Sequence, residues 1–419
     1  MNDLYIKREI IAIDLKSFFA SCECIERNID GFKVPLVVCD PSRNGAITLA
    51  ISPYLKSLRV KGRTRVYDLP RNIKILKVPP RMSLYMQKSK EVIDVYLEFV
   101  SREDMHIYSI DEVFLDVTDY LSFYKKSTYE IALDIINKIK EKTGLPAAAG
   151  IGPNILLAKI AMDTDGKNNK DNIGVINYDD IPNKLWPISP LSKMWGIGPR
   201  MEKKLNILGL SKIGDIANYD KNKLREKFGT LGLELWNHAN GIYLTSVKNL
   251  NISPKEKSIN HSQVLFKDYD DTNIDLIILE MIEVLTRRLR SMKKQTSIIG
   301  FGIGYSREIN GGFSHMIKID KFTKDSKEIY KVCMNMFDKY YDNLPIRKVS
   351  ITLGGLANDD GIQLNLFEEY EEVVSKDKTD QVSDAIKEKF GANSLLKASS
   401  LLQDSTAITR NKKIKGHEA

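Results

Sequence analysis

Residues 109–116, Ser109-Ile-Asp-Glu-Val-Phe-Leu-Asp116, place two adjacent acids, Asp111 and Glu112, between two apolar arms. A second apolar run, Ile10-Ile-Ala-Ile13, ends on Asp14, which is typical of a buried strand that delivers an acid to the edge of a sheet. Neighbouring residues in a regular strand point to opposite faces. Asp111 and Glu112 can therefore converge on one ion only at a turn or bend.

Three carboxylates around one point repel each other unless divalent cations neutralise them, and hard oxygen ligands select Mg2+ or Mn2+. Two such ions about 3.5–4 Å apart can clamp the attacking and leaving oxygens of a phosphoryl displacement. The alternative is a solvated hairpin tip at Asp111 and Glu112, with Asp14 as a helix cap. Spacing alone leaves both interpretations open.

The composition limits the number of domains and the kind of partner. A chain of 419 residues with 42% hydrophobic content is long enough for more than one core. Its formal charge of +8 suits a polyanionic partner such as nucleic acid. The four cysteines lack a paired C-x-x-C spacing, which favours reduced, buried thiols over a zinc site. No stretch approaches the roughly 18 apolar residues of a membrane span, so we expect a soluble, cytoplasmic protein without a membrane partner.

Three motifs resemble those of one enzyme family. Asp14-Leu-Lys-Ser-Phe-Phe-Ala-Ser-Cys-Glu23 is similar to the opening of Y-family DNA polymerases, and Tyr108-Ser-Ile-Asp-Glu112 is similar to their palm motif. Gly150-Ile-Gly-Pro-Asn-Ile-Leu-Leu-Ala-Lys-Ile-Ala-Met-Asp163 resembles the segment that follows. The motifs occur in the family's order and spacing. The resemblance implies a translesion DNA polymerase that acts in DNA repair and the SOS response to DNA damage.

The resemblance also implies an α+β fold of the right-hand type. We expect a palm at residues 1–19 and 83–180, small fingers at 20–82 and a helical thumb with a helix–hairpin–helix at 181–250. A linker at 251–257 should lead into a C-terminal α/β little-finger domain at 258–357, whose pattern is strand–helix–strand–strand–helix–strand. The tail at 358–419 is polar, and we expect it to be weakly ordered.

In this family Asp14, Asp111 and Glu112 would hold two Mg2+ ions, for which Mn2+ can substitute, and the backbone carbonyl of Leu15 would be a further ligand. The substrates would be deoxynucleoside triphosphates. Phe19 falls at the steric-gate position, where a ring beneath the incoming sugar excludes a ribose 2′-hydroxyl. Phe18 is its neighbour in the nucleotide pocket, with core packing as the alternative for both rings.

The family's triphosphate-binding segment appears here as Ser52-Pro-Tyr-Leu-Lys-Ser-Leu-Arg-Val60. Lys56 stands where arginine is usual and Pro53 where tyrosine is usual. A lysine can bind phosphate as a point charge without the bidentate fork. Arg59 and Arg63 could compensate, although such a charge run is more often a solvated face. Ile155 replaces a lysine that touches phosphate in the DNA polymerase IV branch, so one contact is missing or comes from elsewhere.

Two segments are candidates for holding primer-template DNA. Gly196 and Gly198 precede Pro199 in a helix–hairpin–helix-like stretch, where backbone amides and a helix start can bind phosphate without reading sequence. Arg287, Arg288 and Arg290 belong to a run of five cations in eight residues that could follow a phosphate backbone. The alternatives are a structural turn and a solvated helix end.

Residues 363–367, Gln-Leu-Asn-Leu-Phe, resemble the peptide by which bacterial polymerases bind the β sliding clamp. Gln363, Leu364, Leu366 and Phe367 would provide a polar anchor and apolar side chains for a partner's pocket. The alternative is a strand end packed on its own domain. The family resemblance also allows regulatory subunits of the UmuD type as partners.

Two other functions compete with the polymerase. A non-catalytic damaged-DNA-binding factor could keep the same fold, which Pro53, Lys56 and Ile155 favour weakly and the intact acids oppose. A nucleotide cyclase also uses a two-metal palm, but the helix–hairpin–helix and the basic C-terminal domain would then have no purpose.

Overall fold

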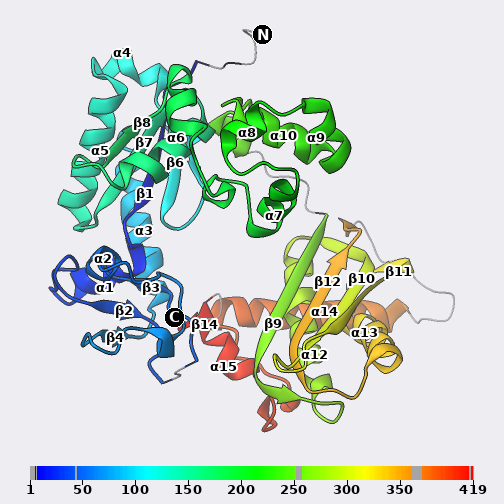
Figure 1. The fold of residues 1–419 in the computed structure, drawn as a ribbon. Coiled ribbons are helices and arrows are strands. Elements are labelled where there is room, and N and C mark those ends of the chain that lie inside the picture. Colours follow the sequence, from blue (N-terminus) through cyan, green and yellow to red (C-terminus); the bar gives the residue numbers. More distant parts are fainter. Residues whose placement is uncertain are drawn as a thin grey trace. The chain divides into compact units, whose positions relative to one another are not determined.

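The computed structural model describes residues 5, 7–42, 45–251, 257–359, 370–414 and 417–418. The chain forms two compact units, residues 1–252 together with 417–419, and residues 253–416. Both units combine helices with antiparallel or mixed sheets (Figure 1), so the expected α+β fold class is confirmed.

A five-stranded sheet in the order β5-β6-β1-β7-β8 organises the first unit. Its strands are β1 (Ile10–Leu15), β5 (Met105–Ile107), β6 (Glu112–Asp116), β7 (Ala147–Gly152) and β8 (Ile173–Val175). Ile10 and Ala12 of the central strand β1 pack with α6 (Ile155–Ala161). Ile11 and Ile13 point to the opposite face and are equally buried. Both faces of the sheet are therefore covered, which explains the uninterrupted apolar run.

Helices and turns surround this sheet. α3 (Met82–Tyr96) and α5 (Thr128–Thr143) pack on each other, and α5 also packs on β7. Ser127 caps α5 together with Glu130, and Gly144 ends it with a φ of 73°. The shorter elements are η3 (Arg102–Asp104), η4 (Thr118–Tyr120), α4 (Leu121–Tyr124), η5 (Met162–Gly166), η6 (Tyr178–Asp180), η7 (Ile181–Leu185) and η8 (Leu191–Lys193).

The segment expected to form the fingers has a small three-stranded sheet in the order β3-β2-β4. Its elements are α1 (Phe18–Glu26), β2 (Leu36–Val38), β3 (Ala50–Ile51), α2 (Pro53–Ser57), η2 (Val66–Asp68) and β4 (Leu76–Val78). Pro53 occupies the first helical position of α2, after Ser52 as N-cap. A proline is therefore compatible with this helix start.

The segment expected to form the thumb is helical. It contains α7 (Pro199–Ile207), α8 (Ile213–Ala217), α9 (Lys221–Phe228), α10 (Thr230–Ala239) and α11 (Val247–Leu250). Its core joins Leu205, Ile213, Leu224 and Leu235. Proline and glycine mark helix boundaries, as expected. Helix α7 starts at Pro199, and Gly209 follows the helix with a φ of 79°.

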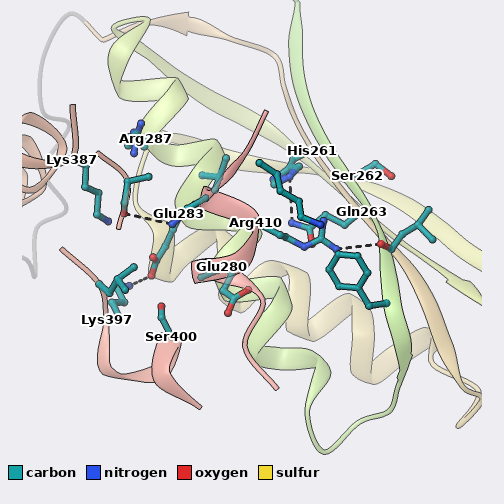
Figure 2. A pocket seen from close by; sticks show the side chains of 18 residues that line it. His261, Ser262, Gln263, Glu280, Glu283, Arg287, Lys387, Lys397, Ser400 and Arg410 are labelled. Atoms are coloured by element: carbon teal, nitrogen blue, oxygen red, sulfur yellow. Dashed lines mark hydrogen bonds and ion pairs between the residues drawn. The ribbon is translucent and has the colours of Figure 1, made fainter. Parts of the chain in front are cut away.

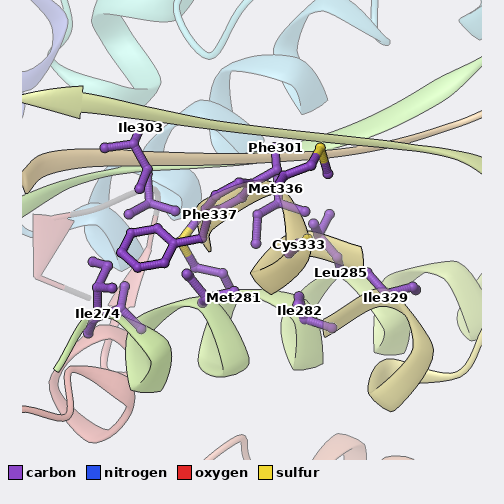
Figure 3. Close-up of a cluster of buried hydrophobic side chains, with 14 of the residues drawn as sticks. Ile274, Met281, Ile282, Leu285, Phe301, Ile303, Ile329, Cys333, Met336 and Phe337 are labelled. Carbon is purple, nitrogen blue, oxygen red and sulfur yellow. The ribbon is translucent and has the colours of Figure 1, made fainter. Parts of the chain in front are cut away.

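The second unit has the sheet order β11-β10-β12-β9. The element sequence is β9 (Ser258–Tyr269), α12 (Ile274–Ser291), β10 (Lys294–Tyr305), β11 (Gly312–Thr323), α13 (Ser326–Tyr340) and β12 (Ile346–Gly354), followed by β13 (Ala357–Asn358). This is the strand and helix pattern expected from the sequence. Figure 3 shows Ile274, Met281 and Leu285 of α12 with Phe301 and Ile303 of β10 in one buried cluster.

The expectation of a weakly ordered tail is wrong for the part that the structure describes. The tail contains α14 (Tyr370–Phe390), η9 (Ala398–Leu401), α15 (Ala407–Asn411), β14 (Lys413–Ile414) and β15 (His417–Glu418). Thr406 is buried, and its hydroxyl donates to Oε2 of Glu280 on α12 at 2.9 Å. The Ser405 hydroxyl donates to the other oxygen at 2.5 Å. Polar tail residues thus satisfy a buried acid of the domain, which composition alone does not reveal.

This contact leads to a stability prediction. Thr406→Ala should lower the free energy of unfolding of the second unit by about 1–3 kcal/mol, because one oxygen of the buried Glu280 carboxylate loses its hydroxyl donor. Thr409→Ala, at an exposed position of the same helix, should change it by less than about 0.5 kcal/mol. Denaturant unfolding measures both variants, and equal stabilities would contradict the docking role of the tail.

The four cysteines, Cys22, Cys24, Cys39 and Cys333, are buried and free, which confirms the expectation of reduced core thiols. Within the described ranges, no helix is long and apolar enough to cross a membrane.

Candidate active site

The backbone brings Asp14, Asp111 and Glu112 to one end of the central strand pair. In the antiparallel pairing of β1 and β6, Asp14 lies opposite Glu112. The amide of Leu15 donates to the carbonyl of Asp111 at 2.9 Å. A bend at residues 109–111 precedes β6, so the two adjacent acids lie at a bend, as strand geometry requires. Glu112 is only 9% exposed, which excludes a solvated hairpin tip.

Burial disfavours charge on two of these acids. It raises the pKa of Asp14 above its ordinary value, a shift that Lys167 partly offsets and Asp111 reinforces. Burial likewise raises the pKa of Glu112, which Lys159 offsets and Asp14 reinforces. Asp111 accepts a hydrogen bond of 2.6 Å from the Ser109 hydroxyl. The cluster is thus a place where additional positive charge would be stabilising.

Two lysines that the sequence reasoning did not assign provide part of that charge. Lys159 Nζ lies 2.8 Å from Oε1 of Glu112, as an ion pair without hydrogen-bond geometry, and 3.1 Å from Asp163. Lys167 Nζ lies 3.0 Å from Oδ2 of Asp14 and 2.8 Å from Asp163. One sequence feature could have identified these lysines. Lys159, Asp163 and Lys167 are spaced by four residues each, which puts them on one side of a helical segment.

These lysines also explain how the acids are arranged. Among the residues that the structure describes, no group of three or more histidine, cysteine, aspartate or glutamate side chains is placed to hold a metal ion. Ammonium groups stand beside Asp14 and Glu112 instead. The backbone therefore brings the three acids to one strand end, while the side chains of Asp14 and Glu112 are engaged in ion pairs.

Lys56 of α2 lies close enough to this cluster for Asp14, Asp111 and Lys167 to influence its pKa. Its side chain is exposed, yet the surrounding protein removes enough water to lower the pKa of the amine, which Asp14 opposes. Arg59 and Arg63 are exposed side chains. Ile155 is 1% exposed and belongs to the core. Of the candidates in this region, Lys56 is thus supported by proximity to the acids.

Phe18 and Phe19 have different environments. Phe18 is 2% exposed, which favours its core-packing alternative over nucleotide contact. Phe19 is half-buried, and its ring lies 4.7 Å from that of Tyr85 between centroids. The Tyr85 hydroxyl donates to Glu23 at 2.7 Å. Burial alone would raise the pKa of Glu23. Hydrogen bonds from Arg81 and Tyr85 nevertheless hold this pKa below its ordinary value. This network fixes the ring beside Phe19.

The glycines of the expected helix–hairpin–helix have open backbones. Gly196 has a φ of 92°, and Gly198 is the N-cap of α7. A Cβ atom at either position would have no neighbour within 4 Å among the described residues. Both glycines are also exposed, so a phosphate group could approach the backbone before α7.

The arginines at the end of α12 differ in their partners. The Arg290 guanidinium binds both oxygens of Asp384, at 2.7 and 3.0 Å, and also lies 3.3 Å from Asp380. Its side chain is 13% exposed, so we assign it to tail docking rather than to DNA. Arg288 is exposed, and Arg287 lines a cavity. Most of the linker, and the residues Gln363, Leu364, Leu366 and Phe367, lie outside the described residues.

Comparisons with known proteins identify the family of this chain. Residues 13–163 match the impB/mucB/samB family, residues 256–366 match its C-terminal domain, and residues 178–210 match the HHH motif of the IMS family. The chain is 37% identical over 417 residues to a Bacillus subtilis protein named as the UV-damage repair protein UvrX, covering 99% of this chain and 98% of that one. It is 32% identical to DNA polymerase IV 2 of Bacillus subtilis, covering 98% and 99%.

Among solved structures, a Y-family DNA polymerase chimera, Dbh-Dpo4(243-245)-Dbh, matches with a TM-score of 0.67 and 23% identity. The match covers 84% of this chain and 99% of the chimera. At this identity the likeness concerns the fold, and it agrees with the right-hand architecture expected from the motifs.

Proposed function

This chain belongs to the impB/mucB/samB family of Y-family DNA polymerases, and we propose that it extends primers along damaged and undamaged DNA templates by two-metal nucleotidyl transfer at Asp14, Asp111 and Glu112. The observation that carries this proposal is the register of β1 and β6, which sets Asp14 opposite Glu112 with Asp111 at the same strand end. All three acids lie inside the segment that matches the family.

The donor set fits Mg2+, with Mn2+ as a substitute, because carboxylate and carbonyl oxygens are its preferred ligands. Asp14, Asp111, Glu112 and the carbonyl of Leu15 would hold the ions. When bound, two such ions stabilise the charge on the attacking and leaving oxygens. The raised pKa values of Asp14 and Glu112 support this assignment, since bound cations would offset the cost of burying these charges.

The triphosphate would be bound by lysines. Lys56 comes from α2 and lies near Asp14, Lys159 comes from α6 and contacts Glu112, and Lys167 follows η5 and contacts Asp14. Once bound cations neutralise the charge of Asp14 and Glu112, the ammonium groups of Lys159 and Lys167 are free to attract the phosphates of a deoxynucleotide. Lys159 and Lys167 are therefore our candidates for the contacts that Pro53 and Ile155 cannot make.

Phe19 is our candidate for the residue beneath the incoming sugar. Its half-buried ring is supported by Tyr85, whose hydroxyl is held by Glu23. A supported ring can exclude a hydroxyl group sterically, because packed side chains yield little.

Primer-template DNA would be bound without recognition of its base sequence. Gly196 and Gly198 offer accessible amides before α7, and Arg288 is an exposed cation on α12. Phosphate contacts of this type position a duplex but do not specify its bases. Such binding suits a polymerase that must accept any template.

Incorporation of single nucleotides tests the proposal against a non-catalytic DNA-binding factor. The purified chain, with Mg2+ and one deoxynucleotide at a time, should extend a primer by the nucleotide complementary to the template base. Primer binding without extension would favour the non-catalytic factor. Extension only after addition of UmuD-type subunits would show that the chain requires these partners.

We further propose that residues 363–367 bind the β sliding clamp, which would raise the local concentration of this polymerase at primer ends. Replacing Gln363, Leu366 and Phe367 with alanine should remove clamp binding and clamp stimulation, yet leave clamp-independent extension nearly unchanged. Asn365→Ala is the matched control, because that position varies in the motif. Stimulation of the triple variant at the wild-type level would refute the clamp role.

A further inference from the structure

A cavity of about 730 Å3 lies in the second unit, between the edge strand β9, helix α12 and the tail. Figure 2 shows His261 and Gln263 on one side and Arg287 and Lys387 on the other. Five basic and two acidic side chains line the cavity, which gives its lining a net charge of +3. Its volume is within the range of small-molecule binding sites.

Both acids already have partners in the tail. Glu280 accepts hydrogen bonds from Ser405 and Thr406, and Glu283 pairs with Lys397. Arg287 and Lys387 form no ion pair with any of the described residues. These two side chains, from α12 and α14, are therefore available to an anion that enters the cavity.

Gln263 of β9 has an unused hydrogen-bonding atom that lies beside the cavity. Gln263 is 5% exposed, and its Oε1 has no hydrogen-bond partner among the described residues. The Nε2 atoms of Gln263 and His261 lie 3.3 Å apart, and His261 also interacts with the carbonyl of Met281. The unused Oε1 is an acceptor, so it suits an N–H or O–H group of a ligand. Buried groups left unsatisfied cost about 1–3 kcal/mol each, so a ligand here would gain from pairing them.

We propose that this cavity binds a phosphate-bearing ligand of nucleotide size, with Arg287 and Lys387 on the phosphates, Gln263 as a hydrogen-bond acceptor and His261 beside the ligand. Val264, Val284 and Leu396 provide apolar surface for the rest of such a ligand. The site goes beyond the polymerase reaction, and it depends on the tail. Lys387, Leu396 and Arg410 lie after residue 366, where the match to the family's C-terminal domain ends.

Histidine ring resonances provide the test, because the chain has only five histidines. Burial lowers the pKa of His261, Arg410 lowers it further, and the carbonyl of Met281 opposes this. Inorganic phosphate, pyrophosphate and ATP are titrated separately into the full chain, and His261→Gln identifies the resonance. We expect a saturable shift of the His261 signal and a rise of its pKa by about one unit, since an anion favours the imidazolium.

The three probes separate the sources of the phosphate. Tighter binding of ATP than of pyrophosphate would identify a nucleotide, whereas equal binding would identify a free oligophosphate. Arg287→Gln with Lys387→Gln should weaken binding at least about tenfold, as expected for loss of two charge-assisted contacts. Arg307→Gln with Lys331→Gln, two exposed cations elsewhere in the same unit, should leave it unchanged.

The proposal would be overturned if no probe gave a saturable shift at His261, or if the Arg287 and Lys387 variant bound like the control pair. A shift of the His261 signal produced by primer-template DNA alone would also overturn the proposal, because the cavity would then be part of the DNA-binding surface. Gln263→Met, of similar volume, gives a second variant in case the double substitution fails to fold. It should also weaken binding.

Discussion

Replacing Asp111 or Glu112 with alanine is expected to reduce nucleotide addition to background while DNA affinity changes by no more than a few fold. The acids serve chemistry, because phosphates gain nothing from carboxylates except through bound cations. Both side chains lie at the strand end opposite Asp14, where no neighbouring acid replaces them in the register of β1 and β6. Single-turnover primer extension measures the first effect, and fluorescence anisotropy with labelled primer-template measures the second.

Asp119→Ala is the matched control for these variants, since Asp119 is an exposed acid a few residues further along. It should extend primers at the wild-type rate. Substantial extension by both active-site variants would contradict the assignment. Loss of DNA binding in parallel with activity would indicate a structural role for the acids instead.

Phe19→Ala should admit ribonucleotides, with discrimination falling by orders of magnitude while deoxynucleotide use survives. A methyl group in place of the ring opens the space next to Tyr85, whose ring now lies 4.7 Å from that of Phe19. Competition between deoxynucleotides and ribonucleotides at a single template position measures the ratio of kcat/KM values.

Tyr85→Phe is the control for the gate. It keeps the supporting ring and removes only the hydroxyl that donates to Glu23, which retains hydrogen bonds from Arg81. Ribonucleotide exclusion should therefore persist. If Phe19→Ala excluded ribonucleotides as well as the wild-type chain does, the gate would lie elsewhere.

The sequence predicted the strand ends that carry Asp14, Asp111 and Glu112, because an apolar run that ends on an acid is a local pattern. The family motif assigned the gate to Phe19 and a neighbouring place to Phe18, but it left core packing open for both rings. Adjacent residues on a helix differ by about 100° in direction, so their roles depend on the partner surface, here Tyr85 of α3. Lys159 and Lys167 were missed because their acidic partners, apart from Asp163, lie on other elements.

The contacts of the tail also could not be predicted from the sequence, because they join residues that lie far apart in the chain. Asp384 binds Arg290, and Thr406 binds Glu280, across 94 and 126 residues of sequence. A polar tail and a basic helix end give no local sign of such pairs. Arg290 was therefore predicted to contact DNA, although its guanidinium is held by the tail.

Lesion bypass is the most direct test of the translesion polymerase function. The purified chain alone, with Mg2+ and the four deoxynucleotides, is given a running start toward an abasic site or a thymine dimer in the template. We predict products that extend past both lesions, and none with Asp111→Ala. Products that reach the end of an undamaged template but stop one nucleotide before each lesion would contradict the translesion assignment, and no extension on any template would contradict the polymerase.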